Sequence, residues 1–293
     1  MLNETRLLVL GATGFVGREV VRQCEAHGVS TIRTSRSGND RVIRFDAANP
    51  SDWLRLQRQA SESEVVAILD LVAPMVNPAH RTSPIIKELE QYGERIAELS
   101  EVLKAKIVHA GTELTGEKED SYTTFKSHVE NALRRNARNL SMVRFPRLIG
   151  SELSSEFFAM KVVHSAVLRS RLELLDPHDE RRYLSVRMAA QVLLANAFWK
   201  LQSPRCDLDQ HTLTCTNQEF VGIVRSHLNS AKKQSINGDP LPFYNKLKIR
   251  WGPLLKCRGL ALDGRGLLEV ASVHDELTMM LKSACDRVRA CGL

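Results

Sequence analysis

The sequence lacks any run of apolar residues approaching the roughly 20 that a membrane-spanning helix needs. Its first residues, MLNETRLLVLGATG, carry neither a basic flank nor a small-residue cleavage site after the apolar stretch, so they do not resemble a secretory signal. With 293 residues and 43% hydrophobic content, the chain can bury a sizeable core. We therefore expect a soluble, unprocessed, cytoplasmic protein without a membrane partner.

The sequence also lacks paired cysteines. Its six cysteines form no CxxC pair and are scattered at positions 24, 206, 215, 257, 285 and 291. This spacing argues against a disulfide framework and a structural zinc site, so we expect free thiols and no metal. A strong charge imbalance is missing too, because a net charge of +7 over this length favours acidic partners only weakly. No aromatic and basic motif accompanies it, so no nucleic-acid partner is expected.

Short apolar runs alternate with helical spacing through the first 150 residues. The predicted strands cover residues 6–10, 30–36, 41–45, 64–72, 106–110 and 140–145. Helical spacing is found at 20–24, 52–60, 84–105 and 122–136. This alternation predicts an α/β fold with a Rossmann-like, doubly wound parallel sheet.

The remaining residues predict a smaller lobe. We expect a dinucleotide-binding domain over residues 1–150 and a mainly substrate-binding C-terminal lobe over 151–293. Within the lobe, the patterns predict helices at 157–171 and 218–227 and strands near 182–186 and 211–216. In folds of this kind the chain returns to the main sheet after entering the lobe, so these strands are expected to join it.

Three glycines stand three residues apart in VLGATGFVGREV, residues 9–20, between the first strand and the first helix. Gly11 would allow the tight turn, Gly14 would let the backbone approach a pyrophosphate, and Gly17 would let the helix pack against the strand. The N–H groups and dipole at the helix start favour an anion. The pattern predicts a dinucleotide-binding loop, whose other members are Thr13, Phe15 and Val16.

Further motifs accompany the glycine loop. GATGFVG resembles the GxxGxxG loop of the extended and atypical short-chain dehydrogenase/reductases, the family that includes nucleotide-sugar epimerases and dehydratases. YTTFK at 122–126, with Glu130 after it, is similar to the family pattern YxxxKxxxE, and VRFPRLIG at 143–150 resembles its sixth strand. The resemblance implies an NAD(P)-dependent oxidoreductase or epimerase, with Lys126 also holding the nicotinamide ribose.

The chemistry of YTTFK follows from its spacing. Residues four apart lie on one face of a helix, so Tyr122 and Lys126 can point at one site. A nearby ammonium is expected to lower the pKa of the phenol. Tyr122 could then exchange a proton with a carbonyl or alcohol oxygen while hydride moves to or from the nicotinamide.

One expected residue is missing. The family supplies a serine or threonine after its fifth strand, but VHAGTELTG places Ala110 or Gly111 there, and Thr112 is the nearest hydroxyl. His109 is a second polar candidate, although a histidine within a strand is more often packed or bonded to a partner. Two hypotheses follow: an enzyme that uses Tyr122, Lys126 and Thr112, or a non-catalytic NADP-binding sensor or interaction protein on the same fold.

An acidic residue is also missing at the end of the second strand, where NAD-binding proteins hold the ribose hydroxyls. The segment IRTSRSG offers Ser35 and Arg36 to a 2′-phosphate, with Arg33 as a weaker helper. NADP is therefore favoured over NAD. By resemblance, Asp46 contacts the adenine and Ala73 lies where the fourth strand passes the cofactor.

A basic stretch, residues 243–265, holds six lysines or arginines and one acid. As a strand, Lys246, Lys248 and Arg250 would share one face, opposite Leu247, Ile249 and Trp251. That face suits either a phosphate-bearing or carrier-protein-tethered substrate or a solvated edge strand. A homodimer is left open. The acidic run at 176–180 is interpreted as a polar loop.

Overall fold

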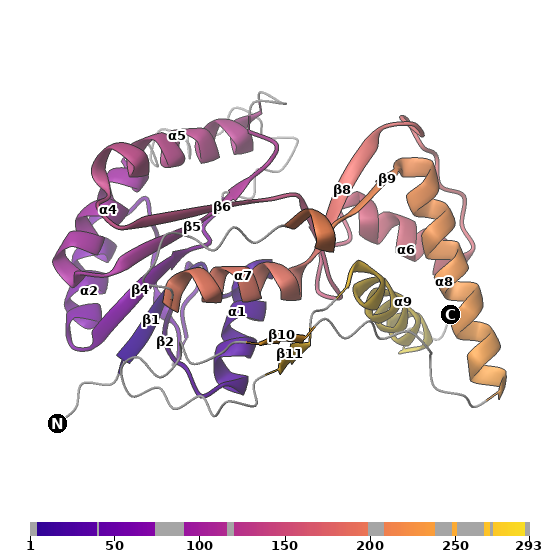
Figure 1. Ribbon diagram of the computed structural model, residues 1–293, viewed down its shortest axis with the longest axis horizontal. Coiled ribbons are helices and arrows are strands. Elements are labelled where there is room, and N and C mark those ends of the chain that lie inside the picture. Colours follow the sequence, from indigo (N-terminus) through magenta and orange to yellow (C-terminus); the bar gives the residue numbers. More distant parts are fainter. Residues whose placement is uncertain are drawn as a thin grey trace. The chain divides into compact units, whose positions relative to one another are not determined.

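The computed structural model describes residues 5–39, 41–73, 91–115, 120–198, 208–237, 248–250, 267–269 and 272–290 (Figure 1). Contacts between Cα atoms divide the chain into two units, a first unit made mainly of Met1–Pro146 and a second made mainly of residues from Arg147 onward. None of the described helices is long and apolar enough to cross a membrane.

The first unit contains a six-stranded parallel sheet, with the order β3-β2-β1-β4-β5-β6. The strands are β1 Thr5–Leu10, β2 Ser30–Ser35, β3 Ile43–Arg44, β4 Glu64–Asp70, β5 Lys106–Thr112 and β6 Leu140–Phe145. The apolar runs of β1 and β4 fill the central positions, where both faces of a strand are buried. The order reverses direction between β1 and β4, and the predicted doubly wound sheet is confirmed.

Four helices of the first unit flank this sheet: α1 Phe15–Ala26, α2 Pro50–Ser61, α4 Tyr92–Leu103 and α5 Ser121–Asn136. Figure 1 shows α2, α4 and α5 on one side of the sheet and α1 on the other. The hydrophobic core lies under α2, α4 and α5, where Trp53, Ile96 and Val129 pack on the strands. Residues 84–90 of the helix predicted over 84–105 lie outside the described residues.

A capping box fixes where α5 begins. The Asp120 side chain accepts a hydrogen bond from the Thr123 N–H at 2.9 Å, and the Thr123 hydroxyl accepts one from the Asp120 N–H at 3.1 Å. The helix therefore starts at Ser121, so Tyr122 lies in its first turn and Lys126 lies one turn further on.

The second unit has its own sheet and core. Its three-stranded sheet contains β7 Arg147–Ile149, β8 Glu180–Ser185 and β9 Leu213–Thr216. The helices are α6 Phe158–Leu168, α8 Asn217–Asn237 and α9 Val273–Ala290, with a 3-10 turn at Leu208–His211; α7 Val186–Phe198 is divided between the units at Ala190. The Tyr183 and Phe220 rings stack with centroids 4.4 Å apart at the centre of this core.

The prediction that strands near 182–186 and 211–216 return to the main sheet is wrong. β8 pairs with β7 and β9 instead, in a separate sheet. Its first residues are charged and partly exposed, and only its last three are buried, which suits a small sheet with one solvated face.

Only part of the basic stretch lies within the described residues. Lys248–Arg250 forms β10, which pairs antiparallel with β11, Leu267–Glu269. The strand predicted here is therefore confirmed over these three residues, while 243–247 and 251–265 lie outside the described residues.

Candidate functional site

The loop between β1 and α1 requires glycine at two positions. Gly11 has a φ of +83°, and a Cβ there would lie 3.3 Å from the carbonyl carbon and oxygen of Leu71. At Gly17, in the first turn of α1, a Cβ would lie 2.1 Å from the carbonyl oxygen of Gly11. The positive φ of Gly11 and the close approach of the loop backbone to Gly17 are conformations that suit glycine.

The start of α1 leaves backbone donors for a ligand. Gly14 is the N-cap residue, and no side chain caps the helix. The first N–H groups of a helix have no partner within the helix, so they and the dipole favour an anion here. Thr13 and Gly14 are exposed, and Phe15 and Val16 are partly exposed, so the loop is accessible. A diphosphate fits this donor set.

Thr34, which the sequence patterns did not single out, braces the loop from β2. Its hydroxyl accepts a hydrogen bond from the Gly11 N–H at 3.3 Å, and its carbonyl oxygen accepts one from the Ala12 N–H at 2.9 Å. The hydroxyl also donates to the carbonyl oxygen of Val9 at 3.3 Å. In the sequence, the only indication of this role of Thr34 is a β-branched residue with a hydroxyl group near the end of the second strand.

Substituting Gly17 tests the geometry of the loop. In Gly17→Ala, the added methyl group must displace the Gly11 carbonyl. We therefore expect the unfolding free energy to fall by about 1–3 kcal/mol and dinucleotide binding to be almost completely lost. Gly222→Ala in α8 is the matched control, because a Cβ there meets nothing within 4 Å. It should stabilise the protein by about 0.5–1 kcal/mol. Urea unfolding of both variants checks this, and a Gly17→Ala protein as stable as the wild type would contradict it.

The predicted cofactor residues beyond the loop follow β2, β3 and β4. Ser35 is buried, and its hydroxyl already accepts a hydrogen bond from the Gly38 N–H at 3.0 Å and contacts the Ser37 hydroxyl at 3.3 Å. The Arg36 side chain is exposed, and no hydrogen bond or ion pair joins it to the described residues. Asp46 and Ala73 are both exposed. All four lie at or beyond the carboxyl ends of their strands, where parallel sheets of this kind bind ligands.

The Thr112 side chain lies close enough to the Tyr122 phenol to lower its pKa, and the Thr112 hydroxyl accepts a hydrogen bond from the Leu114 N–H at 3.3 Å. Thr112 is the last residue of β5 and is buried, while Tyr122 in α5 is partly exposed. The hydroxyl nearest to the missing serine is therefore a neighbour of the candidate acid–base residue.

The prediction that Lys126 lowers the pKa of Tyr122 is wrong. Burial raises the pKa of Tyr122, the Thr112 side chain opposes this, and the negative charge of Asp120 adds to it. The ammonium of Lys126 lies instead against two backbone carbonyl oxygens, those of Val72 at 3.0 Å and Ala110 at 2.8 Å. Tyr122 is therefore a neutral phenol near pH 7, which makes it a proton donor.

Lys126 itself is only 2% exposed. Burial lowers its pKa, and the carboxylates of Asp70 and Glu130 raise it. An ammonium has three N–H donors, and the two carbonyl bonds leave the third for a ligand hydroxyl. This is the donor that a ribose would need, so the residue fits the role that the resemblance implies.

Glu130 lies close to Gly111 in β5. It is buried and forms ion pairs with Arg144 at 2.6 Å and Arg134 at 3.2 Å. A Cβ at Gly111 would lie 2.5 Å from the Glu130 carboxylate and 3.1 Å from the Arg144 side chain. A side chain at this position would require the Glu130–Arg144 pair to shift, and Thr112 is the next residue that carries a hydroxyl.

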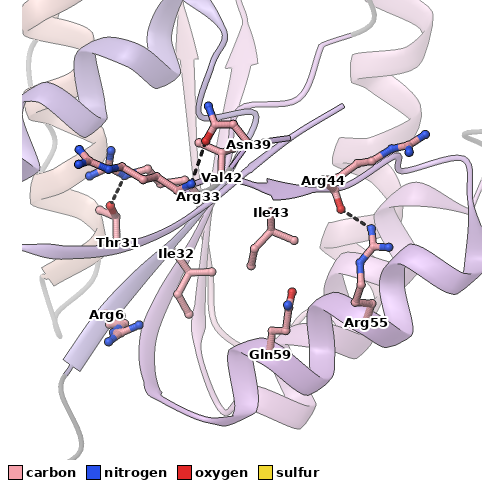
Figure 2. A pocket seen from close by; sticks show the side chains of 11 residues that line it. Arg6, Thr31, Ile32, Arg33, Asn39, Val42, Ile43, Arg44, Arg55 and Gln59 are labelled. Carbon is pink, nitrogen blue, oxygen red and sulfur yellow. Dashed lines mark hydrogen bonds between the residues drawn. The ribbon is translucent and has the colours of Figure 1, made fainter. Parts of the chain in front are cut away.

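Figure 2 shows a separate pocket at the edge of the sheet, with a volume of about 410 Å³ and five arginines among its lining residues. Two of these side chains are already engaged. Arg33 bonds to the Thr31 hydroxyl at 2.8 Å and pairs with Glu25 at 2.7 Å, and Arg55 pairs with Asp52 at 2.9 Å. Arg33 is thus held by its own neighbours, and we do not retain it as a helper for a 2′-phosphate.

One segment connects the glycine loop with the Tyr122 site. The Leu71 N–H donates to the carbonyl oxygen of Leu10 at 3.1 Å, and the Leu71 carbonyl lies against Gly11. The next residue, Val72, accepts the hydrogen bond from Lys126. The glycine loop and Lys126 therefore both contact the segment that follows β4.

Residues 7–137 match the NAD dependent epimerase/dehydratase family. The match runs from β1 through α5, and so includes the glycine loop, Thr112, Tyr122 and Lys126. It confirms the predicted resemblance to epimerase/dehydratase-like members of the short-chain dehydrogenase/reductases. The family is one of NAD-dependent enzymes, so the comparison indicates NAD and gives no support to the predicted preference for NADP.

Solved structures show the same fold at low sequence identity. UDP-glucose 4-epimerase from Thermotoga maritima, solved with UDP-glucose, has a TM-score of 0.67 and 14% identity, over 97% of this chain and 99% of that one. The NAD complex of UDP-glucose 4-epimerase from Thermus thermophilus has a TM-score of 0.65 and 15% identity, over 95% and 98%. The enzyme WbmF from Bordetella bronchiseptica, bound to NAD+, has a TM-score of 0.64 and 14% identity, over 99% and 96%. No curated protein sequence matches the chain.

Proposed function

We propose that this protein is an NAD(P)-dependent epimerase, dehydratase or oxidoreductase that acts on a carbonyl or alcohol carbon of a small, phosphate-bearing substrate of the sugar-nucleotide class. The observation that carries the proposal is the junction at Leu71 and Val72. It brings the glycine loop, which fits a diphosphate, to the lysine that fits a ribose. The nucleotide sugars named with the structural neighbours supply the substrate class.

The residues have distinct roles in this proposal. The backbone of Gly11–Gly17 binds the diphosphate, and Lys126 donates its third N–H to a ribose hydroxyl. Bound nicotinamide would supply the hydride acceptor or donor. Tyr122 holds a proton on its phenol oxygen for the substrate oxygen, and Thr112 orients that phenol. Residues that select the substrate are assigned, as part of this proposal, to the second unit.

The experiment is a turnover assay with NAD and with NADP against UDP-glucose, UDP-N-acetylglucosamine and dTDP-glucose, with products followed by NMR. Conversion of at least one sugar nucleotide is expected. A wild-type protein that binds cofactor but converts none of them, and produces no absorbance change at the reduced-cofactor band with any simple carbonyl or alcohol, would contradict catalysis. That outcome would favour the non-catalytic sensor.

The choice between NAD and NADP depends on Arg36. We propose that its exposed side chain gives NADP measurable affinity alongside NAD. In Arg36→Ala, the dissociation constant for NADPH should rise about tenfold or more, because a charged hydrogen bond to phosphate is lost. The dissociation constant for NADH should change less than about twofold. Calorimetric titration of both cofactors measures the two values, and equal weakening of both would show that Arg36 does not contact a 2′-phosphate.

A further inference from the structure

A buried cluster of polar side chains lies beside Lys126 and has no part in the roles assigned above. Asp70, the last residue of β4, is fully buried. Its carboxylate accepts hydrogen bonds from the Tyr92 hydroxyl in α4 at 2.7 Å and from His109 Nδ1 in β5 at 2.6 Å. Three elements thus direct polar groups to one carboxylate in the interior, where an unpaired charge would be costly.

Asp70 is ionised in this environment. Burial would raise the pKa of its carboxyl group, but the charge and hydrogen bond of His109, the ammonium of Lys126 and the Tyr92 hydroxyl together hold it below its usual range. Because a carboxylate can only accept, His109 Nδ1 must carry the proton in their bond. The other ring nitrogen, Nε2, is buried with no hydrogen-bond partner among the described residues. The Nε2 nitrogen of His109 therefore loses its hydration without gaining a partner among the described residues, while Nδ1 binds Asp70.

The Asp70–His109 pair is directly connected to the two carbonyls that hold Lys126. The Val72 N–H donates to Asp70 Oδ1 at 3.3 Å, and the Val72 carbonyl accepts from Lys126. Ala110, the other acceptor, follows His109 in β5. The pair therefore ties together the ends of β4 and β5 at the place where their carbonyls receive the ammonium.

Among the described residues, Asp70 from β4 and Glu130 from α5 act on the charge of the ammonium, while Tyr92 from α4 and His109 from β5 contact Asp70. The two carboxylates differ in their partners. Glu130 is balanced by Arg144 and Arg134, whereas no arginine pairs with Asp70 among the described residues. The charge of Asp70 therefore interacts with both His109 and Lys126.

We propose that Asp70, held by His109 and Tyr92, is a positioning residue that keeps Lys126 charged and fixed between the carbonyls of Val72 and Ala110, with its third N–H free for the cofactor ribose. Only the last clause rests on the proposed function. The counter-ion role concerns the protein without cofactor and can be tested there.

The first test measures the protonation of Lys126 directly, in cofactor-free protein with isotope-labelled lysine side chains, by NMR over a range of pH. Asp70→Asn preserves the shape but removes the charge, so the pKa of Lys126 should fall below its wild-type value. Asp52→Asn is the matched control, because Asp52 is also a buried carboxylate of the first unit but pairs with Arg55. It should leave the Lys126 titration unchanged.

A folded Asp70→Asn protein with the wild-type Lys126 titration would overturn the proposal. If Asp70→Asn does not fold, the wild-type protein still provides a test. Its Lys126 side-chain signals should show an inflection in acid at the pH where the Asp70 carboxyl signal titrates, and independent titrations would overturn the proposal equally.

The second test measures the dissociation constant for NADH between pH 6 and about pH 9.5. Asp70→Asn should lose affinity at lower pH than the wild type, with a deficit of about tenfold at the alkaline end. A constant ratio of affinities across this range would indicate a purely structural role and would count against the proposal. A wild-type protein that does not bind NADH would instead refute the proposed function, while the Lys126 titration would still decide the role of Asp70.

Discussion

Tyr122→Phe should lower turnover by about 10²- to 10⁴-fold, the range that a positioned proton donor contributes. Thr112, a described neighbour of the phenol, cannot replace it, because an aliphatic hydroxyl is a far weaker acid than a phenol. The dissociation constant for NADH should change by less than about twofold, since cofactor contacts are assigned to the glycine loop and Lys126. Steady-state kinetics and calorimetry on the same preparation measure both effects.

The hydroxyl of Thr112 provides the control for this prediction. Thr112→Ser keeps a hydroxyl beside Tyr122 and should retain most of the activity, whereas Thr112→Val keeps the shape and should lose much of it. Full turnover in Tyr122→Phe would show that another group donates the proton, and the assignment of this side chain would be wrong.

Lys126→Met should weaken NADH binding by about 10- to 100-fold, because a charged hydrogen bond to the ribose is lost while the aliphatic stem still packs. The substitution also leaves the Asp70 carboxylate in the interior without its ammonium. Because Asp70 keeps its hydrogen bonds from Tyr92 and His109, we expect the unfolding free energy to fall by about 1–3 kcal/mol. Calorimetry and urea unfolding at pH 7 give the two values.

The same variant has a predicted pH dependence. In the wild type, the folded pKa of Asp70 lies below its unfolded value, so its stabilisation is present above the unfolded pKa of about 4 and is lost as pH falls through the folded pKa. Loss of the Lys126 charge raises the folded pKa, so the acid-induced loss should begin at higher pH in Lys126→Met. Urea unfolding at several pH values compares the two proteins, and parallel curves would contradict the coupling of Asp70 with Lys126.

Features set by local spacing could be predicted from the sequence. The glycine loop, the parallel strands and the helix that carries Tyr122 and Lys126 each leave a pattern within a few residues, and the structure contains them all. The sheet of the second unit was misplaced because β8 is too short and too polar at its start to show whether its partner is the main sheet or a separate one.

Features set by packing between distant residues could not be predicted. Asp70 and His109 lie 39 positions apart, and nothing in either strand's pattern shows that they touch. Gly111 is one of two residues that stand where the family has a serine or threonine. The sequence does not show that a side chain at this position would meet the Glu130 carboxylate. The pKa of Tyr122 was predicted in the wrong direction because its burial and the carbonyl partners of Lys126 both depend on the fold.

Binding of a dinucleotide by the glycine loop and Lys126 is tested most directly by calorimetry. NADH is titrated into the wild-type protein and into Gly17→Ala, Lys126→Met and Tyr122→Phe. The wild-type protein should bind NADH at one site per chain. Binding should be almost completely lost in Gly17→Ala and clearly weakened in Lys126→Met, and the affinity should be unchanged in Tyr122→Phe. Absence of binding to the wild type, or binding that Gly17→Ala leaves intact, would contradict this role of the glycine loop.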